Sequence, residues 1–331
     1  MHDQRFRVLE LGGYAAGYAG RLFVSAGADV VRVDGPNPPA WVPDAAMDLY
    51  LHSGKRRMDV LSPETLIQLS AAADLVVVEA ENAAALHETG IDSCAERPTV
   101  SITSFGRTGP RRNWRATPGT LLAMGGHTVI SGDADRAPLT IPGHYLEFQA
   151  GTLAFVAGCA SLHEGAGRGA DISMLEVAMS LTQFSFSRFQ CLGEERARHG
   201  DEHHYLTPMN TYACADGAVY VNVVPAFWEV FTIFIDRPEL SMDARFSTNA
   251  GRCQHRDELN QITTEALAGL TRSEVMRRAE EARIPVGMVL TFEEVLRDPQ
   301  LEQRGVWEVL EDDQGQSFAA PRVPYHQART W

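Results

Sequence analysis

The sequence predicts an α/β fold with two lobes, a large lobe on a parallel sheet and a smaller α+β lobe. Three observations support this prediction. Strand-like apolar runs alternate with helix-like runs through residues 1–192. A polar, charged, histidine-rich segment follows at 193–206, and beyond it the pattern changes to a hairpin followed by helices. We therefore expect a large lobe at 1–192, a linker at 193–206 and a small lobe at 207–303, with 304–331 returning to the large lobe as strands and coil.

The first elements predict a βαβ unit. Residues 6–11 have the pattern of a strand, 14–26 that of a helix ended by Gly27, and 29–33 that of a second strand. A crossover of this length requires parallel strands and a right-handed connection. The large lobe is therefore expected to be Rossmann-like.

The later elements follow the same logic. Ser62-Pro63 is a helix start with proline at the first helical position. Two residues, Thr271 and Thr291, begin capping boxes for helices of the small lobe. The remaining expected elements are strands at 75–78 and 99–104, a buried helix at 151–163, a helix at 175–191, a hairpin from 211–213 and 219–223, and helices at 226–235 and 252–270.

Composition excludes several function classes. The chain has 331 residues, 44% of them hydrophobic and 22% charged, which is ordinary for a globular protein with a large core. A net charge of −14 argues against nucleic acid or an anionic membrane as a partner. No apolar run suggests a signal sequence or a membrane span. Five cysteines without paired spacing fit a reducing compartment, so we expect a cytoplasmic protein.

Three glycines near the start invite a dinucleotide-binding interpretation. Gly12, Gly13 and Gly17, with Asp34 further on, lie where a phosphate-binding turn would lie. Their spacing is not G-x-G-x-x-G, and even a true match alone would be weak. A tight turn with close helix–strand packing explains these glycines better than a nicotinamide or flavin site does.

Histidines and acids crowd the predicted linker. They are His199, Asp201, Glu202, His203 and His204. Their spacing is not a recognisable ligand pattern, so we predict no metal. No G-x-S-x-G turn is present to support a serine hydrolase.

The sequence is organised around residues 142–151, Pro-Gly-His-Tyr-Leu-Glu-Phe-Gln-Ala-Gly. Glu147 falls at the head of the buried helix, where backbone N–H groups lack helical partners and an anion is favoured. Two interpretations follow from these residues. Glu147 is either an ordinary acid that complements a helix N-terminus or a catalytic carboxylate.

Five motifs in order resemble the family III CoA-transferases, the group that contains formyl-CoA transferase and carnitine CoA-transferase, with methylacyl-CoA racemases as relatives. The motifs are the opening strand–helix–strand of residues 8–33, the Ser-Gly-Lys-Arg turn at 53–56, Phe-Gly-Arg-Thr-Gly-Pro at 105–110, Arg-Phe-Ser-Thr-Asn-Ala-Gly-Arg at 245–252, and Ile-Pro-Val-Gly at 284–287. The resemblance covers nearly the whole chain.

The resemblance implies exchange of CoA between two carboxylic acids. A side-chain carboxylate attacks the acyl-CoA thioester to form a mixed anhydride, and the released CoA thiolate then forms an enzyme–CoA thioester. The family's aspartate nucleophile stands three residues before the alanine of an Ala-Gly pair. Here that pair is Ala150-Gly151, so the resemblance places Glu147 in the nucleophile's position. The added methylene moves the carboxylate by roughly 1 Å, and such a displacement can cost about a hundredfold in rate.

The resemblance also suggests where CoA binds. Arg107, Arg111 and Arg112 lie in a stretch without acids, and Lys55 with Arg56 forms a second basic group. Arginine matches the CoA phosphates with paired donors. Family members often carry an Asn-Phe-Arg-Pro-Gly segment that holds CoA, but residues 79–84 here lack its arginine, proline and glycine.

Other residues are expected on the substrate side. Gly106 and Gly143 are candidates for the close backbone approach that oxyanion stabilisation needs. His144 and His203 complete this expected substrate side, because the segment around His203 resembles the family's Gly-Asn-x-His-Pro segment near the acyl site.

Two alternatives to transfer stay open. A racemase needs a base and an acid on opposite sides of the substrate's α-carbon, but residues 116–119, where the related racemases supply a histidine, contain none. A repurposed or non-catalytic subunit would explain both the glutamate and the missing Arg-Pro-Gly. The resemblance further implies an interlocked homodimer, and the sequence leaves the donor and acceptor acids undetermined.

Overall fold

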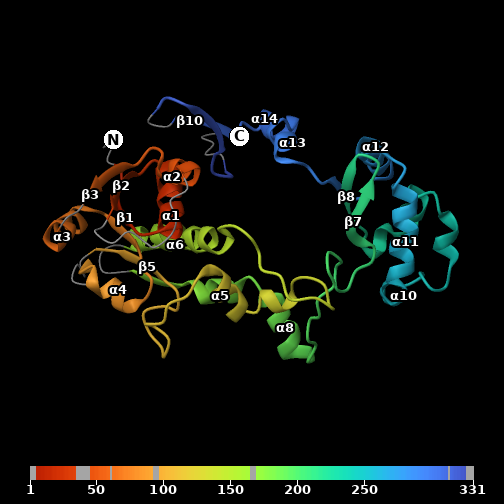
Figure 1. The fold of residues 1–331 in the computed structure, drawn as a ribbon, viewed down its shortest axis with the longest axis horizontal. Coiled ribbons are helices and arrows are strands. Elements are labelled where there is room, and N and C mark those ends of the chain that lie inside the picture. The colour runs from red at the N-terminus through yellow and green to blue at the C-terminus, as the bar shows by residue number, and fades with distance from the viewer. Residues whose placement is uncertain are drawn as a thin grey trace. The chain divides into compact units, whose positions relative to one another are not determined.

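The computed structural model describes residues 5–34, 45–59, 62–91, 97–164, 169–311 and 314–325. The chain divides into two compact units (Figure 1). The first contains Met1–Thr128, Thr140–Gly193 and Gln300–Trp331, and the second contains Val129–Leu139 and Glu194–Pro299. Each unit is described by itself below.

A six-stranded parallel sheet forms the centre of the first unit. Its order is β3-β2-β1-β4-β5-β6. The strands are β1 (Arg7–Leu11), β2 (Asp29–Asp34), β3 (Arg56–Asp59), β4 (Leu75–Glu79), β5 (Thr99–Thr103) and β6 (Ala170–Ser173). Strand order reverses between β1 and β4, and in open α/β sheets ligands bind outside the carboxyl ends of the strands at such a reversal.

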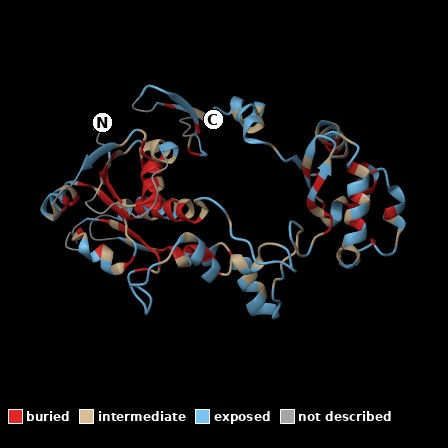
Figure 2. Ribbon diagram, viewed as in Figure 1, coloured by how far each residue is buried: buried red, intermediate tan, exposed pale blue. Residues whose placement is uncertain are grey.

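Helices cover both faces of this sheet. Alternate residues of each strand point to opposite faces, so Val8 and Val77 enter one core and Leu9 and Val76 the other. Buried residues accordingly run along the strands and the helices beside them (Figure 2). The first core is closed by α1 (Tyr14–Ser25), α5 (Pro118–Met124), α6 (Tyr145–Glu164) and α7 (Met174–Ser180), and the second by α3 (Pro63–Ala72) and α4 (Ala83–Glu88).

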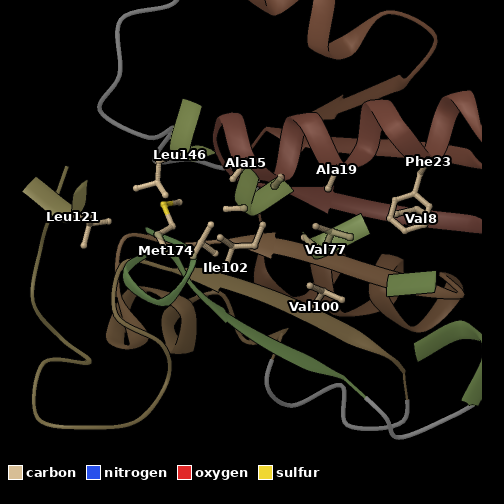
Figure 3. Close-up of a cluster of buried hydrophobic side chains, with 14 of the residues drawn as sticks. Val8, Ala15, Ala19, Phe23, Val77, Val100, Ile102, Leu121, Leu146 and Met174 are labelled. Atoms are coloured by element: carbon tan, nitrogen blue, oxygen red, sulfur yellow. The ribbon is translucent and has the colours of Figure 1, made fainter. Parts of the chain in front are cut away.

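The helices α1 and α6 lie against one another in the same direction. The ring of Tyr18 stacks on Phe148 at 4.6 Å between centroids, and Phe23 meets Phe155 edge-on at 4.8 Å. Figure 3 shows Ala15, Ala19 and Phe23 of α1 directed toward the sheet within the same core. Because the later residues of α1 pair with the later residues of α6, both N-termini reach the carboxyl end of the sheet.

The remaining elements of the first unit lie at its edges. The helix α2 (Ala45–His52) contacts α1, and α8 (Gln183–Leu192) follows α7. Near the end of the chain, α14 (Pro299–Gln303) precedes an antiparallel pair, β10 (Trp307–Glu311) and β11 (Ser317–Pro321). Arg21 of α1 forms an ion pair with Glu308 of β10. The expectation for 304–331 includes residues 312–313 and 326–331, which lie outside the described residues.

A three-stranded antiparallel sheet and a helical layer form the second unit. The order of its strands is β7-β8-β9. Its elements are β7 (Met209–Cys214), β8 (Gly217–Asn222), β9 (Val286–Met288), α9 (Trp228–Phe234), α10 (Asn249–Gln254), α11 (Arg256–Leu267), α12 (Arg272–Ala282) and α13 (Phe292–Leu296). Its core also holds a guanidinium, since buried Arg252 donates to the carbonyls of Thr207 and Phe246 and lies 4.6 Å from the Trp228 ring.

Three local predictions were wrong. The helix expected at 175–191 is divided between Ser180 and Gln183, where the Thr182 hydroxyl donates to the Gly125 carbonyl at 3.1 Å. The helix expected at 252–270 is divided at His255, between α10 and α11. The capping box at Thr271 is half-formed, because Glu274 binds Arg277 and Arg278, whereas the box at Thr291 is complete.

Within the described residues, no helix is long and apolar enough to cross a membrane.

Candidate active site at the carboxyl edge of the sheet

Glu147 lies in the first turn of α6, as its position in the sequence predicts. The helix begins where the Phe148 amide donates to the His144 carbonyl at 2.9 Å. Only 7% of Glu147 is exposed. Its Oε2 atom is buried and accepts no hydrogen bond from any residue that the structure describes. A carboxylate oxygen in this condition is an uncommon feature, because buried polar atoms are nearly always satisfied.

The other oxygen of Glu147 is held by His144. The distance from His144 Nδ1 to Glu147 Oε1 is 3.1 Å, and the two residues lie on one face of the chain because they are three positions apart. His144 is half-buried and packs on the Tyr14 ring at 4.0 Å between centroids. The imidazole is therefore fixed between α1 and the carboxylate, and it distinguishes the two oxygens.

The two predicted glycines occupy different surroundings. Gly143 is exposed, with φ of +76°, directly before α6. Gly106 is buried with φ of +83°, after β5. The next amide, that of Arg107, donates to Asp171 Oδ2 at 2.9 Å. The Arg107 amide is therefore already hydrogen-bonded within the protein. Of the two glycines, Gly143 lies closer in sequence to Glu147.

The arginine-rich loop also follows β5. Arg107, Arg111 and Arg112 are exposed, and the Arg111 guanidinium lies 5.2 Å from the Trp114 ring centre. The Arg112 carbonyl accepts the Ala83 amide of α4 at 2.9 Å. This contact holds the loop at the carboxyl end of β4 and β5, the same edge of the sheet that Glu147 reaches.

The acids of residues 79–84 are compensated within the fold. Glu79 ends β4, and its Oε2 accepts the Ala16 amide of α1 at 2.9 Å. Glu81 pairs with Arg115 at 3.1 Å, and the Asn82 side chain caps α4 by accepting the Ala85 amide at 3.0 Å. The segment that replaces Arg-Pro-Gly therefore has defined structural contacts.

The charge of Glu147 acts on the carboxyl group of Glu79. Glu79 as a whole is half-buried, but its carboxylate lies against the backbone amides at the start of α1. Loss of hydration raises the pKa of Glu79 to about 7, and the Glu147 charge adds to this effect. The amides of Ala16, Ala15 and Gly13 act in the opposite direction. Sequence reasoning missed Glu79 as a site residue, and its position at the end of an apolar strand was the available signal.

Lys55 lies inside a buried ionic cluster on the other side of α1. Its Nζ is 2.5 Å from Glu10 Oε2, 2.7 Å from the Gly17 carbonyl oxygen and 3.2 Å from His52 Nδ1. The Lys55 and Glu10 side chains are both fully buried, and Arg32 also binds Glu10 at 3.0 Å. An ammonium committed in this way cannot meet a phosphate, so we correct the expectation that Lys55 binds CoA.

Arg56 and Arg57 lie on the edge strand β3, which the sequence did not predict. Both are exposed, and both are already paired. Arg56 forms a bidentate pair with Asp29, and Arg57 binds Asp34 and Asp48. Arg56 is therefore reachable by a ligand, but only in competition with Asp29.

His203 belongs to the second unit. Loss of hydration, together with the charge of Arg196, lowers the pKa of His203. Nearby, Glu202 binds Arg256 at 2.9 Å, and the Tyr212 hydroxyl donates to Asn260 Oδ1 at 2.6 Å. No group of three or more His, Cys, Asp or Glu residues suited to a metal occurs among the described residues.

Comparisons with known proteins agree with one another. The model of CoA-transferase family III matches residues 4–330. The chain is 28% identical to a succinyl-CoA–D-citramalate CoA-transferase of Chloroflexus aurantiacus, over 88% of this chain and 79% of that protein. It is 26% identical to a succinate–glutarate CoA-transferase of Agrobacterium fabrum, over 98% and 89%. The fold is similar to that of a CaiB/BaiF family protein from Brucella suis, with a TM-score of 0.84, 23% identity and coverage of 98% and 92%.

Proposed function

The chain belongs to CoA-transferase family III, and we propose that it transfers CoA from succinyl-CoA to a small dicarboxylic acid through a covalent intermediate on Glu147. CoA is then a substrate and acyl carrier, and no metal takes part. The names of three relatives support the choice of acids, since they pair succinate or succinyl-CoA with D-citramalate, glutarate and mesaconate.

The observation that carries this proposal is the asymmetry of the Glu147 carboxylate. Oε1 is held by His144, while Oε2 is buried without a hydrogen-bond partner among the described residues. A nucleophile needs an oxygen that is not already engaged, in a position where ionisation is favoured. The helix N-terminus favours the anion. Oε2 is therefore the atom that attacks the thioester carbonyl.

His144 has a specific task in this mechanism. Glu147 is one methylene longer than the family's aspartate and has one more rotatable bond. The contact at 3.1 Å removes this freedom by fixing Oε1. A glutamate held in this way presents one defined oxygen to the thioester, so the longer side chain remains compatible with nucleophilic attack.

CoA binding is assigned to the loop after β5. The exposed guanidinium groups of Arg107, Arg111 and Arg112 offer paired donors for phosphate oxygens at the edge of the sheet that carries Glu147. Arg56 contributes only if it exchanges Asp29 for a phosphate. The backbone at Gly143 and Gly106 borders the acyl group, and His203 is retained as a substrate-side residue of the second unit.

We do not propose a racemase. A two-base mechanism needs groups on opposite sides of one carbon. His144, directly before α6, and Glu147, in its first turn, instead hydrogen-bond to one another, so they approach a substrate from one side.

The test is capture of the intermediate. After incubation with succinyl-CoA and proteolysis, mass spectrometry should find CoA on the peptide that carries Glu147. Glu147→Gln should abolish the adduct and lower kcat at least about 10³-fold, because the attacking atom is lost. Glu176→Gln is the matched control, an exposed acid in the first turn of α7, and should leave the adduct intact. An active Glu147→Gln enzyme would remove Glu147 from the mechanism.

We further propose an interlocked homodimer located in the cytoplasm. No residue of α8 is buried, and it exposes four large apolar side chains, Phe184, Phe186, Phe189 and Leu192. Such a surface is typical of a partner interface. Light scattering on dilution tests the assembly, since interlocked subunits cannot separate while folded. A folded monomer at low concentration would refute the interlocked dimer.

A further inference from the structure

Four aromatic rings join the beginnings of α1 and α6. The His144 imidazole packs on the Tyr14 ring at 4.0 Å between centroids, and the Phe148 ring lies 6.2 Å from the imidazole. Tyr18 stacks on Phe148 at 4.6 Å. Tyr14 and Tyr18 are four positions apart on α1, and His144 and Phe148 are four positions apart at the start of α6, so each pair lies on one side of its helix. We call these four side chains the aromatic clamp.

A glycine contact fixes the separation of the two helices beside the clamp. A Cβ at Gly151 would lie 2.5 Å from the Ala15 carbonyl oxygen and 3.1 Å from the Tyr18 Cβ. The backbones of α1 and α6 are therefore in direct contact at the corner where their first turns meet. Because a close-packed interior yields little, the helices cannot move together there to replace a ring that is removed.

Tyr14 is the buried support of the clamp. Only 7% of Tyr14 is exposed, whereas His144 is half-buried. An ionised carboxylate only accepts hydrogen bonds, so the His144 Nδ1 atom carries the hydrogen in its contact with Glu147 Oε1 at 3.1 Å. The torsion that turns an imidazole plane has a broad minimum, so one hydrogen bond does not fix that plane. The Tyr14 ring restricts the rotation because it lies against the imidazole.

We propose that Tyr14 is a positioning residue for the nucleophile: its ring holds the His144 imidazole in the plane from which Nδ1 fixes Glu147 Oε1, and this keeps Oε2 as the attacking oxygen. The inference rests on the proposed function of Glu147. Tyr14 itself exchanges no proton with the substrate and forms no bond to it.

The clamp should act on the rate of acylation and not on the affinity for CoA. If the imidazole turns, Oε1 is released and the Glu147 side chain gains other rotamers, and a displacement of roughly 1 Å at a reacting atom can cost about a hundredfold in rate. CoA binding is assigned to the loop after β5, which contributes no residue to the clamp. Loss of the Tyr14 ring should therefore lower kcat and leave the KM for succinyl-CoA nearly unchanged.

The experiment compares two substitutions of Tyr14 with a matched control. Tyr14→Leu should lower kcat by about 10-fold to 100-fold, and Tyr14→Phe should restore most of the activity because it keeps the ring. Phe23→Leu is the control, since it removes the edge-on contact with Phe155 between the same two helices. It should lower stability in chemical denaturation but keep kcat. Tyr14→Met, which keeps most of the buried volume without a ring, is the second variant if Tyr14→Leu does not fold.

A double-mutant cycle tests whether Tyr14 acts through the imidazole. When His144 is already Ala, Tyr14→Leu should cost almost no further kcat, because the group that the ring holds is gone. An equal loss of kcat in the His144→Ala enzyme, an unchanged kcat in Tyr14→Leu, or a Tyr14→Phe enzyme as slow as Tyr14→Leu would each overturn the inference. The absence of a CoA adduct on Glu147 in the wild type would instead refute the proposed function.

Discussion

Two buried glutamates on either side of α1 have opposite surroundings. Glu10 is fully buried, with Lys55 at 2.5 Å and Arg32 at 3.0 Å. Glu147 is almost as deeply buried, yet among the described residues its carboxylate contacts only the His144 imidazole through Oε1, and Oε2 accepts no hydrogen bond. A buried charge is costly unless it is paired. Glu10 is paired with two cations and so stabilises the fold, while Glu147 has one oxygen without a hydrogen-bond partner among the described residues.

Breaking the paired cluster should have the largest effect. Lys55→Met leaves Glu10 buried beside fewer counter-charges and should lower the free energy of unfolding by about 3–5 kcal/mol. Chemical denaturation measures this loss. Arg277→Met, which breaks the exposed ion pairs of Arg277 with Glu274 and Glu281 on α12, is the control and should change stability little. An equally stable Lys55→Met protein would show that the cluster does not support the fold.

Neutralising the unpaired acid should have the opposite sign. Glu147→Gln removes a charge that lacks a counter-ion and should raise the free energy of unfolding by on the order of 1 kcal/mol, since active sites often hold destabilising groups. Glu147→Asp keeps the charge and should show no such gain. A stability loss in Glu147→Gln would indicate that this carboxylate is paired after all.

The two regions should also respond to pH with opposite slopes. Burial lowers the pKa of His52 from 6.5 to about 2, so the unfolded chain binds the extra proton and stability falls as pH drops below 6.5. Glu79 has its pKa raised from 4.5 to about 7, so the folded chain binds the extra proton and stability falls as pH rises from 4.5 to 7. Relative to wild type, His52→Gln should gain stability toward acid, and Glu79→Gln should gain it toward pH 7. Chemical denaturation at pH 5, 6 and 7 measures the stability of each variant relative to the wild type. If the two stability differences change with pH in the same direction, the opposite pKa shifts of His52 and Glu79 are contradicted.

The smallest expected effect is on CoA binding, where surface arginines with an acidic partner should differ from those without one. Arg111 and Arg112 have no acidic partner among the described residues, while Arg56 is paired with Asp29. Arg111→Ala and Arg112→Ala should each weaken CoA binding by roughly threefold to tenfold, and added salt should reduce the difference. Arg56→Ala should weaken it less. Titration calorimetry measures the CoA affinity of each variant. If all three variants bind CoA as tightly as the wild type, the loop after β5 does not contribute to CoA binding.

Local pattern predicted much of the large lobe. The alternation of apolar strands and helices indicated β1, α1, β2, β4, β5 and α6, because each carries its signal within a few residues. The spacing of three between His144 and Glu147 is compatible with their contact, but that contact was not predicted. The strand β3 was missed because its sequence, Arg-Arg-Met-Asp, is polar and its pairing depends on β2.

Contacts between distant segments could not be predicted. Lys55 follows a glycine turn and precedes two arginines, so the sequence suggested a basic surface, yet the fold brings Glu10 to it from 45 residues away. Glu79 and Ala16 are 63 residues apart, and their contact exists only because β4 lies next to β1. The division after α7 likewise depends on the Gly125 carbonyl that Thr182 reaches.

The close contact of Gly151 with the Ala15 backbone has a consequence for how this site can vary over evolution. Because main chain rests on main chain there, substitutions around the corner cannot slide one helix along the other without disrupting the core. The remaining adjustable dimension is the reach of the acid side chain itself. Exchange between aspartate and glutamate at position 147 therefore changes the reach of the carboxylate by one methylene while the two helix backbones stay in place. The imidazole of His144, three residues earlier, holds the longer acid in a fixed position.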